Sequence, residues 1–165
     1  MKRWLFVLLI AWAAAAHAAA DTMGGVVIVV IDGDTVLFKP DHYHPGSRAF
    51  LKVRLADIDA PEKDQPHGER ATRALQDLVL KQRAELDVVA IDAYGRKVGR
   101  LNRGAVSVAA EMVRMGSAWA TTRGQGETAL QEMQREARRA RRGLWQDAAP
   151  TPPWVWRRAQ SAPAY

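Results

Sequence analysis

The sequence predicts a β-rich α+β fold in which a small antiparallel barrel of five strands carries three helices. Five segments rich in β-branched or alternating apolar residues stand before or between three segments of helical periodicity. Strand and helix do not alternate regularly, which disfavours a parallel sheet built from βαβ units. The chain has 165 residues, of which 48% are hydrophobic, so it can bury one sizeable core. An OB-like barrel is the small all-antiparallel arrangement that closes the edges of five such strands.

The strand segments carry the clearest local signals. The first two are joined by Asp32-Gly33-Asp34, an Asp-Gly turn in which the glycine can accept a positive φ. In the third strand, Leu51, Val53 and Leu55 point one way while the intervening residues point the other. The predicted strands are Gly25–Ile31, Thr35–Lys39, Arg48–Leu55, Glu85–Ile91 and Arg96–Leu101.

Three later segments have apolar residues at helical spacing. We predict helices over Gly68–Leu80, Val106–Met115 and Glu127–Arg142, the last two ending at Gly116 and Gly143. These elements place one barrel domain at residues 21–146. Residues 147–165 are rich in Pro and Ala and contain Trp, so we expect a C-terminal tail with an aromatic anchor on the barrel.

Residues 1–20 have the pattern of a Sec-type signal peptide. Basic Lys2 and Arg3 precede the apolar stretch Trp4–Ala16, and Ala-x-Ala sites predict cleavage before Ala19 or Asp21. The alternative is an uncleaved membrane anchor, although a span needs about 20 apolar residues. We therefore expect an exported protein, periplasmic or secreted, that is a monomer and has no stable membrane association after cleavage.

Composition narrows the chemistry. The chain has no cysteine, which excludes thiol catalysis and thiolate metal sites. Its formal charge is +6, and loss of Lys2 and Arg3 with the leader would leave +4. A mildly basic surface of this kind is compatible with a polyanionic partner such as nucleic acid.

Four carboxylates lie in two loops that a barrel could bring together. They are Asp32, Asp34, Asp59 and Glu62. Clustered carboxylates repel one another unless a cation lies among them, and oxygen ligands select Ca²⁺, Mg²⁺ or Mn²⁺. The alternative is that each acid is an ordinary turn or capping residue.

Two arginines favour the functional interpretation. Arg54 points away from the apolar face of its strand, and Arg96 follows a Tyr-Gly turn. A guanidinium group grips phosphate with two parallel hydrogen bonds and stays charged. Carboxylates, a cation and two arginines together are suited to phosphodiester hydrolysis, whereas surface ion pairs with Asp57, Asp92 or Glu85 are the alternative.

Three segments together resemble the active-site blocks of the staphylococcal-nuclease-like (thermonuclease) family. They are Ile31–Val36, Val53–Glu62 and Asp92–Arg96, in the family's order and spacing. The resemblance extends over about Val26 to Gln146, and Pro152-Pro153-Trp154 is similar to the tail of exported bacterial members. It implies a Ca²⁺-dependent nuclease that acts on DNA and RNA.

The resemblance also implies roles for individual residues. The Ca²⁺ ligands would be Asp34 and Asp59 through their side chains, Ala60 through its backbone carbonyl, and Asp32 through water. Glu62 matches the proposed general base, Arg54 and Arg96 match the phosphate-binding arginines, and Tyr94 matches a residue at the nucleotide site.

One segment departs from the family pattern. After Gly116 the family commonly has an aromatic-x-Tyr pair, whereas this chain reads Trp119-Ala120-Thr121. Trp119 is the remaining candidate for contact with a nucleotide, and a missing tyrosine would weaken substrate binding rather than the chemistry. The rival interpretation is a non-catalytic barrel module that binds nucleic acid or protein.

Overall fold

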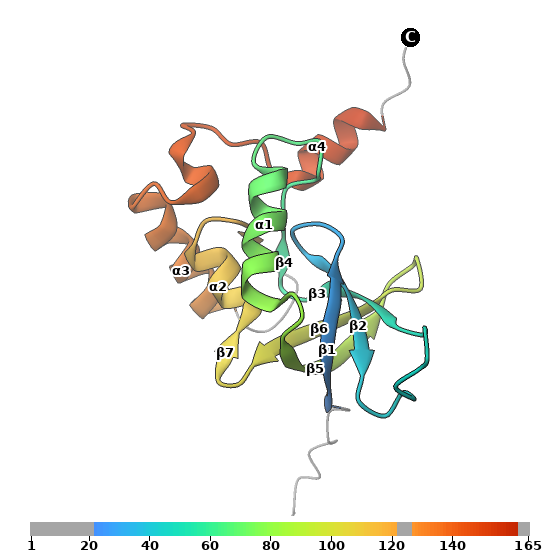
Figure 1. Cartoon of the computed structure of the whole chain (residues 1–165). Coiled ribbons are helices and arrows are strands. Elements are labelled where there is room, and N and C mark those ends of the chain that lie inside the picture. Colours follow the sequence, from blue (N-terminus) through green and yellow to red (C-terminus); the bar gives the residue numbers. More distant parts are fainter. Residues whose placement is uncertain (1–21, 122–126, 162–165) are drawn as a thin grey trace, which may run out of the picture.

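The computed structural model describes residues 22–121 and 127–161, and these form a closed barrel flanked by helices (Figure 1). The barrel strands are β1 (Thr22–Val30), β2 (Thr35–Pro40), β3 (Leu51–Leu55), β5 (Arg83–Ile91) and β6 (Lys97–Arg103). Antiparallel pairs give the order β3-β2-β1-β5-β6, and β3 also pairs with β6. The predicted five-stranded barrel is confirmed. Its closing pair, however, is parallel, with Arg54 opposite Val98, so the expectation of antiparallel pairing throughout is wrong there.

Short strands accompany the five barrel strands. Strands β4 (Ile58–Asp59) and β8 (Trp119–Ala120) form a separate antiparallel pair. At the far end of β6, β7 (Val106–Ser107) adds a two-residue strand where the sequence predicted the first turn of a helix. Asp59 is thereby fixed opposite Trp119.

The three predicted helices are present, and the chain forms a fourth. They are α1 (Gly68–Val79), α2 (Val108–Arg114), α3 (Glu127–Arg139) and α4 (Pro153–Gln160), with a 3₁₀ turn, η1, at Gly143–Gln146. The predicted tail therefore contains a helix, whose start fits Pro153 at its first position. In Figure 1, α4 lies beside the loop that enters α1.

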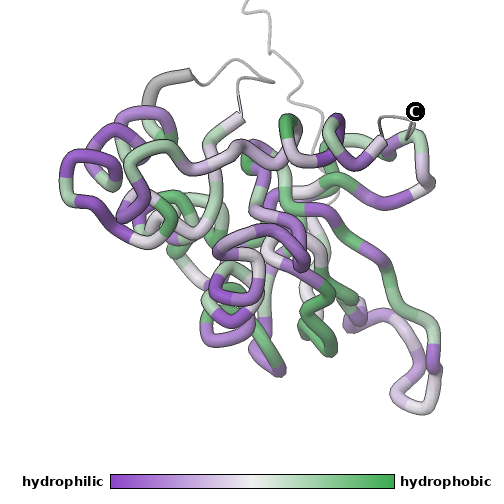
Figure 2. The backbone as a smooth tube through the Cα atoms, turned by 90° about the horizontal axis from the view of Figure 1, so that it is seen from above, coloured by the Kyte–Doolittle hydropathy of each residue, from purple (hydrophilic) through white to green (hydrophobic). Residues whose placement is uncertain are grey.

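The core lies inside the barrel and beneath α1 and α2. Val27, Phe38, Val53 and Leu86 are fully buried strand residues, and α1 adds the apolar face that includes Leu75. Figure 2 shows hydrophobic and hydrophilic residues alternating along these elements. Burial of each large aliphatic side chain contributes about 1.5–3 kcal/mol, so this core supports a rigid scaffold for the loops.

A second cluster joins α3, η1 and β8 through Trp119, Ala137, Leu144 and Trp145. It depends on Gly116 and Gly143, which both have a positive φ and approach each other closely. A Cβ on Gly143 would lie 2.2 Å from the Gly116 carbonyl oxygen, which also accepts a hydrogen bond from Leu144 N–H. Both glycines were predicted helix ends, and their contact explains why no larger residue fits.

The predicted leader, residues 1–20, lies outside the described residues. Within the described part, no helix is both long and apolar enough to cross a membrane.

Candidate active site

The turn between β1 and β2 presents Asp34 to the interior. The Ile31 N–H donates to the Thr35 carbonyl, and the Asp34 N–H donates to Asp32 Oδ1 at 3.0 Å. Gly33 does not have the positive φ that the sequence predicted. A Cβ there would instead lie 2.6 Å from Ala60 Cβ and 2.8 Å from Ala71 Cβ. Glycine is therefore required by close packing of the turn against the next loop and α1.

Asp34 is almost completely buried, with 4% of its surface exposed, and its carboxylate is fully engaged. Oδ1 accepts hydrogen bonds from Thr35 Oγ1 at 3.0 Å and from Arg54 Nη1 at 3.2 Å. Oδ2 accepts the Ala60 N–H at 3.0 Å. The carboxylate thus ties together β2, β3 and the loop after β4.

Arg54 connects the two predicted side-chain metal ligands. From the middle of β3 its Nη2 lies 3.2 Å from Asp34 Oδ2 and 2.8 Å from Asp59 Oδ1. Asp59 is itself 5% exposed. Asp34 and Asp59, which are 25 positions apart in sequence, therefore contact the same guanidinium group. The sequence predicts that a barrel can bring these two acids together.

Burial raises the pKa of Asp34 to about 7. The positive charge of Arg54 opposes this shift, while the nearby charges of Asp32 and Asp59 add to it. The anionic form is therefore costly here unless more positive charge is present.

The backbone N–H and carbonyl of Glu62 both form hydrogen bonds with Gln65. Its N–H donates to Gln65 Oε1 at 3.1 Å, and its carbonyl accepts the Gln65 N–H at 3.0 Å. Gly68 begins α1 directly beneath: a Cβ there would lie 1.8 Å from the Glu62 carbonyl oxygen. Gln65 is buried, and its Nε2 donates to the Thr151 carbonyl at 2.5 Å, which links Glu62 to the segment before α4.

Three carboxylates, Asp34, Asp59 and Glu62, form what we call the acidic cluster. Arg157 of α4 binds two of them. Arg157 Nη1 donates to Glu62 Oε1 at 2.7 Å and to Asp59 Oδ1 at 3.1 Å, and Nη2 donates to Asp59 Oδ2 at 2.7 Å. The hydrogen bonds with Asp59, above all, raise the pKa of Arg157 above its ordinary value. Neither Arg157 nor Gln65 is predicted as a site residue from the sequence. Pro152-Pro153 did signal a helix start, but nothing local placed that helix at the site.

The second predicted arginine lies elsewhere. Arg96 Nε donates to Asp92 Oδ2 at 2.7 Å, and its guanidinium stands 5.6 Å from the centre of the Tyr94 ring. Among the described residues, these partners do not belong to the acidic cluster. Arg96 directly precedes β6, whose Lys97 and Val98 pair with Val53 and Arg54, so the topology brings it to the same end of the barrel. Its pairing with Asp92 is the alternative that the sequence left open.

The two aromatic candidates differ in accessibility. Tyr94 is 86% exposed at the tip of its turn and can receive a ligand. Trp119 is 6% exposed and packs edge-on against Trp145 and Trp154, with centroids 5.2 and 6.3 Å apart. Its ring offers little surface for stacking, and Trp154, 39% exposed, is the more open indole.

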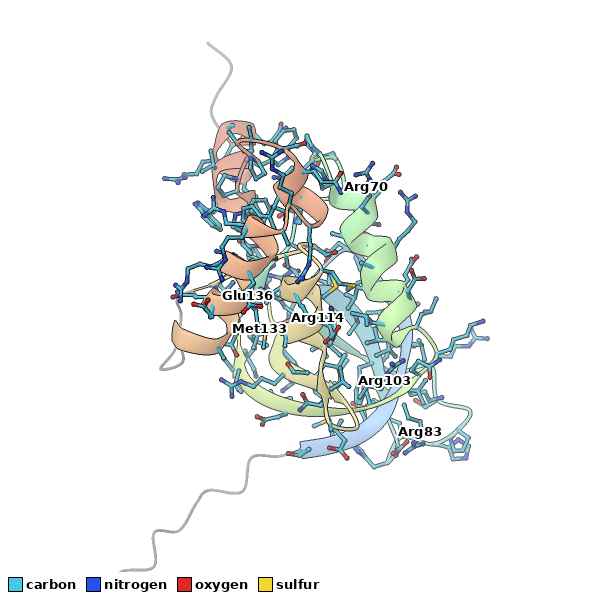
Figure 3. The ribbon with its side chains drawn as sticks, turned by 90° about the vertical axis from the view of Figure 1, so that its left-hand side faces the viewer. Arg70, Arg83, Arg103, Arg114, Met133 and Glu136 are labelled. Carbon is cyan, nitrogen blue, oxygen red and sulfur yellow. The ribbon has the colours of Figure 1, made fainter. Side chains whose placement is uncertain are left out.

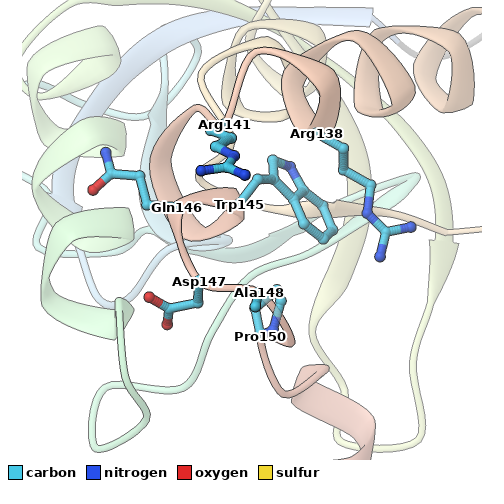
Figure 4. A pocket seen from close by; sticks show the side chains of 7 residues that line it. All are labelled: Arg138, Arg141, Trp145, Gln146, Asp147, Ala148 and Pro150. Carbon is cyan, nitrogen blue, oxygen red and sulfur yellow. The ribbon is translucent and has the colours of Figure 1, made fainter.

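Two hollows lie on the surface of the described residues, and no side chain of the acidic cluster lines either of them. A pocket of about 380 Å³ is lined by residues 138, 141, 145–148 and 150, with Arg138 lying over the Trp145 ring (Figure 4). A wider hollow of about 910 Å³ runs from Lys63 to Arg73 and includes Trp156, a neighbour of Arg157. The second adjoins the cluster through the residues that follow Glu62.

Other arginines lie on the outside of the molecule. Arg70, Arg83, Arg103 and Arg114 are on its surface (Figure 3). On α3, Arg135 pairs with Glu132. These side chains contribute positive charge to the surface and not to the acidic cluster.

The donor set fits a hard cation in part. Asp34 and Asp59 offer carboxylate oxygens near the Ala60 backbone, and such oxygens suit Ca²⁺ or Mg²⁺. Within residues 22–121 and 127–161, no three His, Asp or Glu side chains are arranged as a complete metal site. Asp59 and Glu62 instead face Arg157. The predicted ligand roles of Asp34, Asp59 and the Ala60 carbonyl, and the water-mediated role of Asp32, remain predictions.

Comparison with known proteins agrees with this arrangement. Residues 52–147, more than half of the chain, match the family model described as staphylococcal nuclease homologue. The chain belongs to the staphylococcal nuclease family. It is 38% identical over 134 residues to an Escherichia coli O157:H7 protein named "Uncharacterized endonuclease", covering 81% of this chain and 84% of the relative.

Two further relatives extend the match. "Micrococcal nuclease" of Shigella flexneri is 38% identical over 146 residues, covering 82% of this chain and 80% of the relative. "Protein ParB" of Escherichia coli is 40% identical over 175 residues, covering 96% of this chain and 95% of the relative. The family that the three motif blocks indicated is therefore confirmed.

Proposed function

We propose that this member of the staphylococcal nuclease family is a Ca²⁺-dependent endonuclease that hydrolyses DNA and RNA by in-line attack of water on phosphorus. The observation that carries the proposal is the junction of Asp34, Arg54, Asp59 and Glu62 at one end of a rigid barrel. Relatives named as nucleases over most of the chain's length support the same activity.

Asp34 and Asp59, with the Ala60 carbonyl and with Asp32 through water, would hold Ca²⁺. When bound, the ion would supply positive charge that stabilises negative charge developing on the phosphate. The raised pKa of buried Asp34 is consistent with a site that gains from such a charge.

The remaining steps belong to the chain's own side chains. Glu62 accepts a proton from water as the water oxygen forms its bond to phosphorus and the bond from phosphorus to the leaving sugar oxygen breaks. Arg54 donates hydrogen bonds to the phosphate oxygens, and Arg96 does so from the end of the parallel strand pair. Tyr94, exposed beside Arg96, would contact the nucleotide.

The test is cleavage of single-stranded DNA and of RNA by the purified protein, with millimolar Ca²⁺ or with a chelator in its place. We expect cleavage only when Ca²⁺ is present. Glu62→Gln should lower the cleavage rate by about 10²–10⁴-fold. Glu69→Gln is the matched control, since Glu69 is an exposed acid on α1 paired with Arg73. An intact substrate with wild-type protein and Ca²⁺, or full activity of Glu62→Gln, contradicts the proposal.

The cleavage assay, combined with a mobility-shift experiment, distinguishes the nuclease from the rival, a non-catalytic binding module. Such a module would bind nucleic acid in the mobility-shift experiment and would leave it uncut in Ca²⁺. The presence of Asp34, Arg54 and Asp59 in one hydrogen-bonded group favours the enzyme, because a binding surface has no need of two buried carboxylates.

We further propose that the protein is exported and acts as a monomer after removal of residues 1–20. Basic Lys2 and Arg3, the apolar stretch and the two Ala-x-Ala sites support the proposed export. Mass determination of the mature N-terminus after fractionation is the measurement, and Met1 retained on protein from the membrane fraction would contradict it.

A further inference from the structure

The C-terminal helix α4 is anchored at the edge of the acidic cluster by contacts on both sides. Pro153 is buried at its start, and Trp154 packs edge-on against Trp119. The Thr151 carbonyl just before it accepts the hydrogen bond from buried Gln65. Because Trp119 pairs with Asp59 and Gln65 binds the Glu62 backbone, α4 docks on the two elements that carry these acids.

From this position Arg157 takes up both oxygens of Asp59. Nη1 and Nη2 lie 3.1 and 2.7 Å from Oδ1 and Oδ2, so the guanidinium binds the carboxylate in the bidentate, end-on geometry. Arg54 also donates to Oδ1 at 2.8 Å. Three of the roughly four lone-pair sites that Asp59 could offer a metal ion are therefore directed at guanidinium N–H groups.

The same guanidinium restrains Glu62. Its Nη1 lies 2.7 Å from Glu62 Oε1, which makes a charge-assisted hydrogen bond. One of the two oxygens that could receive a proton from water is therefore already occupied by a guanidinium N–H. The contact thus opposes the role proposed for Glu62.

Electrostatics set α4 in competition with a divalent cation. In the described structure the three carboxylates of the acidic cluster face two guanidinium groups, Arg54 and Arg157. A dication bound by Asp34 and Asp59 would stand next to Arg157, and like charges repel. Arg157 is the more readily displaced of the two arginines, since its side chain is 42% exposed whereas that of Arg54 is 22% exposed.

We propose that α4 is an autoinhibitory latch: Arg157 occupies Asp59 and Glu62 in place of the divalent cation and leaves Asp59 when the cation binds. Docking of α4 then lowers the affinity for the cation and keeps Glu62 paired until the cation arrives. The latch rests on the proposed Ca²⁺ site, but it concerns a segment beyond the residues matched by the family model, which end at 147.

The test is Ca²⁺ binding measured by titration calorimetry on the metal-free wild-type protein and on Arg157→Ala. We expect Arg157→Ala to bind Ca²⁺ about tenfold more tightly, equivalent to about 1.4 kcal/mol. The matched control is Arg158→Ala, which removes the same charge from the same helix. Among the described residues, Arg158 contacts the Trp154 carbonyl and no carboxylate, so its substitution should leave the affinity within about twofold of wild type.

A second measurement follows the helix itself. In hydrogen exchange, amides of residues 154–160 should exchange faster when wild-type protein is saturated with Ca²⁺, because the Arg157 contacts have been released. In Arg157→Ala they should exchange fast with or without Ca²⁺. Unchanged protection of α4 on Ca²⁺ binding to wild type would overturn the latch.

The outcomes also separate the latch from the nuclease. Equal or weaker Ca²⁺ affinity in Arg157→Ala overturns the latch while leaving the calcium site intact. Tighter binding without cleavage of DNA or RNA supports the latch and contradicts the nuclease. No Ca²⁺ binding by either protein overturns both.

Discussion

Arg54 and Asp34 face each other across β2 and β3 through two contacts, Nη1 to Oδ1 and Nη2 to Oδ2, both at 3.2 Å. The register explains the pairing: Arg54 lies opposite Thr35, so its guanidinium reaches the residue just before that strand. The carboxylate is buried and the guanidinium is mostly buried. This ion pair therefore contributes to the stability of the barrel and also positions two residues of the candidate active site.

Removal of this arginine should therefore cost both stability and activity. Arg54→Ala leaves Asp34 buried without its main counter-charge, and we expect a loss of about 2–3 kcal/mol in unfolding free energy at pH 8. Activity should fall by about 10²–10³-fold. Chemical denaturation and rate measurements check both effects.

A double-mutant cycle identifies the cause. If the lost counter-charge is responsible, Arg54→Ala with Asp34→Asn should be more stable than Arg54→Ala alone. Arg70→Ala, an exposed arginine on α1, serves as the control and should change stability by less than about 0.5 kcal/mol. Equal losses for Arg54→Ala and Arg70→Ala would contradict the argument.

The local parts of the site were predictable from sequence, since each predicted residue of the acidic cluster lies in or next to a short strand with a clear pattern. Asp34 ends a turn, Arg54 alternates with apolar residues, and Asp59 ends β4 three positions before Glu62. The three motif blocks also indicated the family correctly. Spacing within such blocks survives because one or two elements fix it.

The rest depended on contacts between distant segments. Arg157 meets Asp59 and Glu62 across 98 and 95 positions, and no periodicity encodes such a meeting. Parallel closure of the barrel by β3 and β6 is likewise non-local. Gly33 shows a different limit, because its Asp-Gly context predicted a positive φ while the actual constraint is Ala60 and Ala71 packed against it.

Gly68 should be intolerant of even one added methyl group. In Gly68→Ala the Cβ would lie 1.8 Å from the Glu62 carbonyl oxygen, so the loop or the start of α1 has to move. We expect a loss of about 1–3 kcal/mol and a displaced Glu62, hence slower cleavage. Gly46→Ala is the control, because a Cβ there has no contact shorter than 3.4 Å. Thermal unfolding and cleavage rates that match wild type in Gly68→Ala would refute the packing argument.

The buried carboxyl of Asp34 should make metal-free stability depend on pH. Burial raises its pKa from 3.8 to about 7 in the folded protein, so between these values the folded state binds the extra proton. Stability from this group is complete below about pH 4 and is lost as the pH rises to 7. The loss should amount to roughly 2–4 kcal/mol.

Denaturation of wild type and Asp34→Asn in a chelator, from pH 4 to pH 8, measures that loss as a difference. The difference in unfolding free energy between the two proteins should shift in favour of Asp34→Asn as the pH rises. Asp64→Asn, an exposed acid in the same region, should follow wild type throughout. Parallel profiles for wild type and Asp34→Asn would show that Asp34 titrates normally.

Gln65 should control whether α4 stays docked. Its side chain joins the Glu62 N–H to the Thr151 carbonyl, so Gln65→Ala leaves a donor and an acceptor without their partner. We expect a loss of about 1–3 kcal/mol and faster hydrogen exchange in residues 154–160. Gln160→Ala, an exposed position at the end of α4, is the control and should leave both unchanged.

Because Arg157 reaches the acidic cluster only from docked α4, Gln65→Ala should also bind Ca²⁺ more tightly than wild type. Normal exchange of α4 in Gln65→Ala would mean that Pro153 and Trp154 dock the helix without it.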